Sequence, residues 1–183
     1  MPLPSPVERD HLHTRRIRCE GFKRADGLWE IEGRLTDTKS YDFDSRVRGR
    51  LRASEKVHLM RMRLTLDDDF VVREVHVSLD EYPYPACLGI APDYQQLVGL
   101  RVGPAWSSEV REMFGGVKGC LRIIELADNL ADTAFQTMGP LMPELLNSTE
   151  NKPPHLDTCH ALSTSGPVVQ EFYPTWYHDE ESR

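Results

Sequence analysis

The sequence predicts an α+β fold: a five-stranded antiparallel meander, helices packed on one face of it, and an ordered C-terminal tail. Alternating apolar and polar residues, typical of strands with one wet face, fill the first half of the chain. An apolar stripe with helical spacing begins at Cys120 in the second half. Pro83 and Pro85 separate the two halves, and strands followed by helices indicate an α+β architecture.

Five strand-like runs account for the predicted meander. The first two flank Asp26-Gly27, a strong hairpin signal, and the third is the short run 47–51, whose arginines face water. The fourth run, "VHLMRMRLTL", and the fifth, "FVVREVHVSL", flank an acidic turn at 67–69. The residues expected on the dry face are Trp29, Ile31, Gly33, Leu35, His58, Met60, Met62, Leu64, Leu66, Val71, Val75, Val77 and Leu79.

Three helices are expected to cover the dry face. "PDYQQLVG" predicts a short helix that ends at Gly99, and "SSEVREMF" predicts a second, with serines at its N-terminus and two glycines after it. The third begins at Cys120. Its core-facing residues are Cys120, Ile123, Ile124, Ala127, Leu130, Ala131 and Ala134.

Length and apolar content indicate one domain over residues 1–183. The chain has 183 residues, of which 39% are hydrophobic, enough to form a single core. We expect residues 1–10 to form a flexible lead and 139–155 a loop. The aromatic content of "VVQEFYPTWY" predicts that the tail, 156–177, is ordered.

Composition also excludes several classes of partner. The net charge of -7 argues against nucleic acid, because phosphate contacts need clustered Lys and Arg. No apolar run is long enough to span a membrane, and "MPLPSPVERD" lacks the pattern of a signal peptide. We therefore expect a cytoplasmic protein with four reduced cysteines and no disulfide, and a homo-oligomer is left open.

Strand directions place the candidate side chains at two ends of the meander. Because alternate strands run in opposite directions, His58 at the start of the fourth run should lie near Tyr84, which follows the fifth. Asp26 is expected at that end too, whereas Asp37 is expected at the opposite end with the acidic turn 67–69. His58, Tyr84 and Asp26 are therefore candidate acid–base groups. Because His58 is expected on the dry face with Met60 and Met62, the alternative is a core histidine with one hydrogen bond.

The tail adds the adjacent pair Cys159 and His160. Neighbouring side chains diverge in regular backbone, so only one of the two is expected to enter a site. We predict that His160 is the inward residue and a further catalytic group. Asp157 is expected to accept hydrogen bonds from local backbone amides.

Several segments together resemble the bacterial family catalogued as domain of unknown function 2889. The resemblance covers about residues 11 to 177 and rests on "HTRRIRCEGFKRADGLWEIEGRLTDTK", "VHLMRMRLTLDD", "GGVKGC" and "LDTCHAL…GPVVQEFYPTWY". It implies an association with enzymes of aromatic-compound breakdown. The family usually has Gly-Cys-Thr-His-Leu where this chain has "GCLRI", so Arg122 stands in place of a histidine.

Residues 57–136 also resemble the NifU-like fold of iron–sulfur scaffold proteins. The similarity lies in a strand pair across an acidic turn, followed by Tyr-Pro-Ala-Cys and by a cysteine that opens the last helix. It implies that Cys87 and Cys120 stand where that fold has two of its cysteines. The third cysteine has no counterpart in this chain.

Three functions follow as hypotheses. The first is a small lyase that uses no organic cofactor and acts on a small aromatic substrate, with Arg122, Arg63 and Trp106 as substrate-binding residues. The second is a zinc- or iron-binding protein with Cys87, Cys120 and His58 as ligands, since zinc accepts mixed Cys/His sets. The third is a binding module without chemistry.

Overall fold

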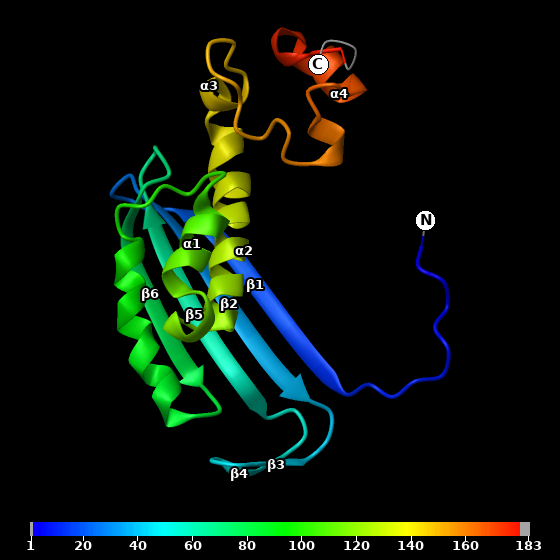
Figure 1. Ribbon diagram of the computed structural model, residues 1–183, viewed down its shortest axis with the longest axis vertical. Helices are drawn as coiled ribbons and strands as arrows, with labels where there is room; N and C mark the ends of the chain where they lie inside the picture. Colours follow the sequence, from blue (N-terminus) through cyan, green and yellow to red (C-terminus); the bar gives the residue numbers. More distant parts are fainter. Residues whose placement is uncertain (1, 180–183) are drawn as a thin grey trace.

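A single antiparallel sheet forms the centre of the fold in the computed structural model, which describes residues 2–179. Its strands are β1 (His13–Lys23), β2 (Trp29–Lys39), β5 (Lys56–Leu66) and β6 (Val72–Glu81), in the spatial order β1-β2-β5-β6. Every neighbouring pair is antiparallel, and helices lie in front of the sheet in Figure 1. The predicted α+β class is confirmed.

The third predicted strand is not part of this sheet. Its residues belong to a separate hairpin of β3 (Phe43–Ser45) and β4 (Gly49–Leu51) at the lower end of the sheet in Figure 1. Each of these strands has three residues, too few to pair along the eleven-residue β2 and β5. The sheet therefore has four strands instead of five, and β2 pairs directly with β5.

The two faces of the sheet follow the predicted alternation along β2 and β5, whereas at the start of β6 Val72 is buried in place of the predicted Val71, beside an irregularity in the pairing of β5 and β6. Ile31, Leu35, Met62 and Leu64 are buried under the helices, as expected. A side chain at Gly33 would lie 2.8 Å from a methyl carbon of Leu126, so glycine lets the helix layer approach β2 closely. The other face of the sheet carries polar and charged residues.

Four helical segments follow β6 and lie on the side of the dry face (Figure 1). The 3-10 helix η1 (Pro85–Leu97) packs beside β6, followed by α1 (Trp106–Phe114), η2 (Gly116–Lys118) and α2 (Leu121–Met138). α2 contacts β1, β2 and β5. Among the described residues, no helix combines the length and the apolar character that crossing a membrane would need.

The C-terminal part is a chain of short helices beyond the end of α2 (Figure 1). Residues 139–155 are not a plain loop, because they contain η3 and α3, and the tail contains η4, α4 and η5. Trp176 Nε1 donates a hydrogen bond of 2.9 Å to the Ser148 carbonyl, which ties the tail to this segment. The bounds of these elements are Gly139–Leu141, Pro143–Leu146, His160–Leu162, Pro167–Phe172 and Pro174–Trp176.

Candidate active site

A buried histidine–carboxylate pair lies where β2 ends and β5 begins. Asp37 and His58 are direct cross-strand neighbours on the face that the helices cover. They are only 2% and 7% exposed, respectively. The prediction that Asp37 lies at the opposite end of the sheet is wrong, because the predicted meander has a further strand between β2 and β5. Removing that strand reverses the direction of β2 relative to β5.

Asp37 accepts hydrogen bonds from three side chains on two elements. Arg15 of β1 donates with two nitrogens, Nε to Oδ1 at 2.8 Å and Nη2 to Oδ2 at 3.0 Å. Arg122 of α2 donates from Nε to Oδ2 at 3.3 Å, and His13 Nε2 lies 3.1 Å from Oδ1. Burial alone would raise the pKa of Asp37, but the hydrogen bonds and charge of Arg15, joined by Arg122, lower it to about 2. Asp37 is therefore a carboxylate at neutral pH.

His58 contacts this carboxylate without forming a well-aligned hydrogen bond. Its Nδ1 lies 3.0 Å from Asp37 Oδ2, yet it is a buried nitrogen without a hydrogen-bond partner among the described residues. Burial and the nearby charge of Arg122 lower the pKa of His58 to about 4, although Asp37 acts in the opposite direction. The imidazole is therefore neutral at pH 7 and can accept a proton.

A second ion pair fixes α2 over this pair of residues. Arg15 Nη1 donates to Glu125 Oε2 at 2.7 Å while its other nitrogens hold Asp37. One guanidinium thus joins β1, β2 and α2. The formal charges of Arg15 and Arg122 balance those of Asp37 and Glu125, so the cluster is neutral overall.

The cluster reaches the surface through the side chains that surround Asp37. The side chain of Arg122 is 33% exposed, and that of His13 is about half exposed. Two hollows lie elsewhere on the surface, one of about 520 Å³ on the open face of the sheet and one of about 790 Å³ beside Trp29 and Asp68. Asp37 and His58 line neither of them. A ligand can therefore reach the cluster at the exposed parts of Arg122, Arg15 and His13.

Asp26 does not share this site. It lies in the turn between β1 and β2, at the end of the sheet opposite His58, where Trp29 Nε1 donates to Asp68 Oδ1 at 2.8 Å. Its carboxylate pairs with Arg24 at 2.7 Å in an exposed position. The expectation that Asp26 and His58 share an end is wrong, again because β2 pairs directly with β5.

The other expected residues of the enzyme site are dispersed. Tyr84 follows β6 at the His58 end, as predicted, but its side chain is exposed. Arg63 is on the open face of the sheet, paired with Glu32 at 2.5 Å. Trp106 is a core residue whose Nε1 donates to a backbone carbonyl of α2 at 3.1 Å. Of the three predicted substrate-binding residues, the structure brings only Arg122 to His58.

The tail does not place His160 in the site. Cys159 and His160 are both exposed, so the prediction that one of them points inward is wrong. The inward histidine of this region is His155, whose two ring nitrogens are buried without a hydrogen-bond partner in the described chain. Asp157 accepts a hydrogen bond of 2.8 Å from the backbone amide of Thr164, seven residues later, which closes this part of the tail into a loop.

The four cysteines are free thiols in the structure. Cys87 in η1 and Cys120 at the start of α2 are partly buried against the core. Within residues 2–179, no group of three or more His, Cys, Asp and Glu side chains is arranged to hold a metal ion. Cys87, Cys120 and His58 therefore do not form such a group, and metal binding stays a prediction without a ligand set.

Four residues of the cluster, Asp37, Arg15, His13 and Glu125, are absent from the candidates that the sequence suggested. The sequence does contain a signal for Asp37. It is two residues after Leu35 and therefore on the same dry face of the strand as Ile31, Gly33 and Leu35. A carboxylate at such a position needs a buried cation as its partner. Arg15 has the same inward parity on β1, two residues before Ile17.

Comparison with known proteins identifies the family. A family profile described as "Protein of unknown function (DUF2889)" matches residues 13–136, a range that includes Arg15, Asp37, His58 and Arg122. Neither the curated proteins nor the solved structures contain a match, and the expected likeness to NifU-like scaffold proteins is not confirmed. Since the profile covers more than half of the sequence, the chain belongs to the DUF2889 family of proteins of unknown function.

Proposed function

We propose that the chain is a small cytoplasmic enzyme that works by acid–base chemistry, with His58 as the proton acceptor. The observation that carries this proposal is the contact of 3.0 Å between a buried neutral imidazole and a buried carboxylate. Titratable groups with strongly shifted pKa values in one cluster are characteristic of functional sites.

The roles of the residues follow from their charges. His58 is neutral at pH 7 and takes a proton from the substrate, and the carboxylate of Asp37 stabilises the imidazolium that forms. Asp37 stays ionised because Arg15 holds it with two hydrogen bonds. His58 and Asp37 thus form the base and its stabilising partner.

Arg122 gives the site a preference for an anionic substrate. Its positive charge is one cause of the low pKa of His58, so an anion bound to Arg122 offsets that effect and raises this pKa toward the ordinary value. His58 then becomes a better base only when substrate is present. Arg122 lies in the first turn of α2, where the helix dipole also favours an anion.

The substrate class we propose is a small aromatic carboxylic acid, and the reaction is a lyase reaction without an organic cofactor. His58 removes a proton, the electron pair left behind forms a double bond, and the leaving group departs with the electrons of its own bond. The resemblance of this chain to proteins that accompany aromatic-compound breakdown supports the aromatic class. The partly exposed Arg122 supports the carboxylate.

The test combines turnover with a titration. The purified protein is incubated with a panel of aromatic acids and lignin-type dimers, and products are measured by liquid chromatography and mass spectrometry. We expect turnover of one class of compounds. The rate of turnover should fall at least a hundredfold in His58→Gln and should not change in the exposed control His178→Gln. In parallel, NMR of the His58 ring should show its pKa rising when a non-reacting aromatic carboxylate binds.

Two results contradict the proposal. One is wild-type turnover by folded His58→Gln. The other is the absence of turnover over the whole panel, together with a His58 pKa that no aromatic carboxylate changes.

A further inference from the structure

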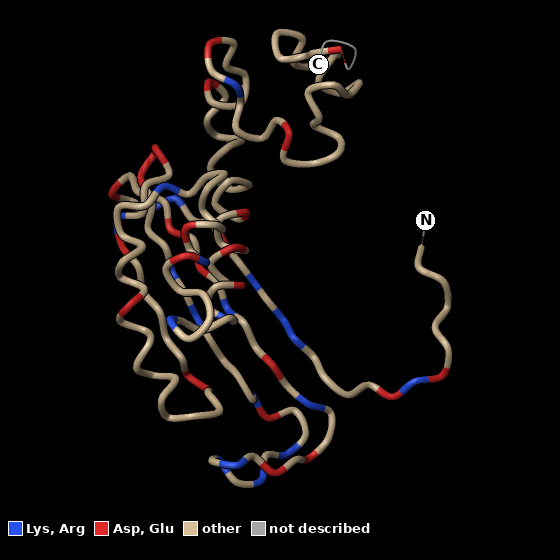
Figure 2. Tube along the Cα trace, viewed as in Figure 1, with Lys and Arg blue, Asp and Glu red and all other residues tan. Residues whose placement is uncertain are grey.

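The face of the sheet opposite the helices carries three arginines side by side. Arg18 on β1 pairs in register with Arg34 on β2, which in turn pairs with Arg61 on β5. Neighbouring strands are about 4.8 Å apart, so the three side chains start within about 10 Å of one another. In Figure 2 both basic and acidic residues lie on the strands of the sheet, and β1 carries mainly basic ones.

This arrangement is unfavourable without a counter-charge, because like charges directly opposite each other destabilise a sheet. The outer two arginines have acidic partners, Glu20 at 2.8 Å from Arg18 and Asp80 at 2.9 Å from Arg61. The central Arg34 forms no hydrogen bond or ion pair with any residue that the structure describes. Its guanidinium is thus flanked by two cations and available to an anion.

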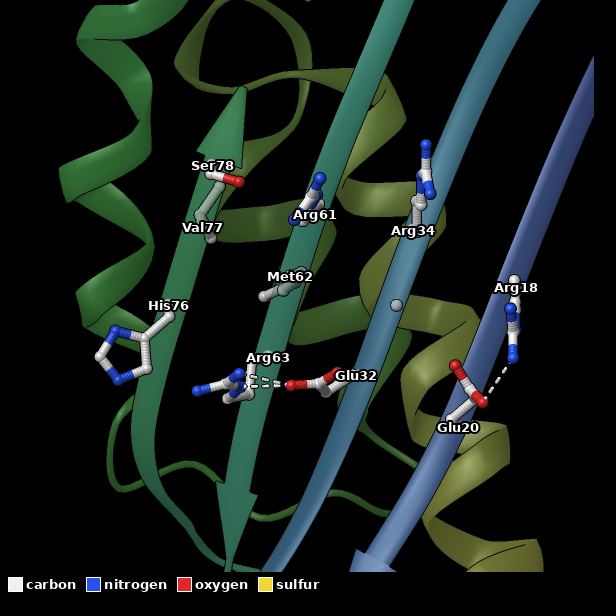
Figure 3. A pocket seen from close by; sticks show the side chains of 11 residues that line it. Arg18, Glu20, Glu32, Arg34, Arg61, Met62, Arg63, His76, Val77 and Ser78 are labelled. Atoms are coloured by element: carbon white, nitrogen blue, oxygen red, sulfur yellow. Dashed lines mark hydrogen bonds and ion pairs between the residues drawn. The ribbon is translucent and has the colours of Figure 1, made fainter. Parts of the chain in front are cut away.

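A shallow groove of about 520 Å³ runs across the strands beside these arginines (Figure 3). One wall is the row Arg18, Arg34, Arg61 and Ser78, and the other is the next row on the same face, which includes Glu20, Glu32, Arg63 and His76. The floor lies at Gly33, Met62 and Val77, which belong to the row facing the helices. We name this feature the arginine groove.

The groove is positive although the protein is negative. Its lining contains four arginines against two glutamates, in a chain with a net charge of -7. Glu32 already pairs with Arg63, so it does not reach across to the opposite wall (Figure 3). Because Arg18 and Arg61 are each paired with a carboxylate, the guanidinium of Arg34 is the unpaired positive charge at the centre of the groove.

We propose that the arginine groove binds a small organic anion with two or more carboxylate or phosphate groups, centred on Arg34. A guanidinium offers a planar pair of donors to such groups, and an anion in this place removes the repulsion between the three arginines. The volume is within the range of small-molecule sites. An extended acidic peptide fits less well, because Glu30 and Glu74 follow on the same face beyond the groove.

This site is separate from the Asp37–His58 pair, which faces the helices on the other side of the sheet. The inference therefore does not depend on the proposed enzyme function. Each of the two can fail while the other holds.

The experiment is calorimetric titration of the full chain at low ionic strength with citrate, with inorganic pyrophosphate and with hexaglutamate. We expect citrate or pyrophosphate to bind, and the one that binds more tightly shows whether the natural ligand carries carboxylates or phosphates. Arg34→Gln should weaken this binding at least tenfold. The matched control Arg111→Gln, an exposed arginine on α1 that pairs with Asp128, should bind within twofold of the wild type.

Protein stability gives a second, independent measurement. Without ligand, Arg34→Gln should melt at the same temperature as the wild type or higher, because it removes like-charge repulsion. With ligand, only the wild type and Arg111→Gln should gain thermal stability. The proposal is overturned if neither small anion binds, if Arg34→Gln binds them as tightly as the wild type, or if only hexaglutamate binds, which would make the face a dock for an acidic protein segment.

Discussion

Lowering the pH from 7 to 5 should destabilise this fold through His58. The pKa of His58 is lowered from 6.5 to about 4 in the folded chain, chiefly by burial and then by the charge of Arg122. An unfolded chain takes up a proton at this histidine below pH 6.5, whereas the folded chain does not until about pH 4. The unfolded state therefore binds more protons in this window, and stability falls as the pH falls.

The size of the effect follows from the two pKa values. The free energy of unfolding should fall by about 2 kcal/mol between pH 7 and pH 5, and by about 3 kcal/mol by pH 4. Asp37 adds a loss of the same sign only at lower pH, because its pKa falls from 3.8 to about 2 on folding. Between pH 6.5 and pH 4 the loss of stability is therefore caused mainly by the protonation of histidine.

Urea unfolding followed by tryptophan fluorescence at pH 7, 6 and 5 measures this loss. Burial also lowers the pKa of His155, so the difference between the wild type and His58→Gln isolates His58. We expect the variant to lose about 2 kcal/mol less than the wild type over this range. NMR titration of the His58 ring in the wild type gives a check that does not require a variant.

Equal pH slopes in the two proteins, or a His58 ring that titrates at or above pH 6.5, would refute this reasoning. Either result would mean that Asp37 stabilises the imidazolium at least as much as burial and Arg122 disfavour it. His58 would then take up its proton in the folded protein at the same pH as in the unfolded chain, or at a higher one.

Two further changes test the packing at the site and under the sheet. Asp37→Asn removes a buried anion from its cationic partners and should cost about 3 kcal/mol in urea unfolding, whereas exposed Asp26→Asn should leave stability nearly unchanged; similar losses would mean that the buried cluster is not built as described. Gly33→Ala places a methyl group 2.8 Å from a leucine of α2 and should lower stability by about 1 to 3 kcal/mol, and Gly89→Ala, with open space around it, is the control. A neutral Gly33→Ala would show that α2 can shift freely on β2.

Much of the local structure could be predicted because it depends on neighbouring residues. The alternation in "VHLMRMRLTL" shows which side chains of β5 are buried, and the apolar stripe after Cys120 shows which face of α2 packs on the sheet. The expected helix in "SSEVREMF" became α1, which ends at Phe114, immediately before the glycine pair. Each of these features repeats over a few residues of one segment.

The active-site cluster depended instead on which strands are neighbours. Alternation shows which face a side chain occupies but not which strand lies beside it, and the run 47–51 is as alternating as a sheet strand. If this run is counted as a sheet strand, the predicted position of Asp37 is at the end of the sheet opposite His58, and that of Asp26 is at the same end as His58. The length of the run, short beside its eleven-residue neighbours, was the available signal.

Periodicity along the chain is enough to predict the α+β class, the buried faces of β2 and β5 and the core face of α2. It does not predict that Asp37 meets His58, that Arg15 and Arg122 hold the carboxylate, or that three arginines stand in one row. Those contacts join residues up to 85 positions apart, and they depend on strand order and register. One strand more or less in the sheet changes the end at which two given side chains meet. The alternation within a strand does not show how many strands the sheet contains.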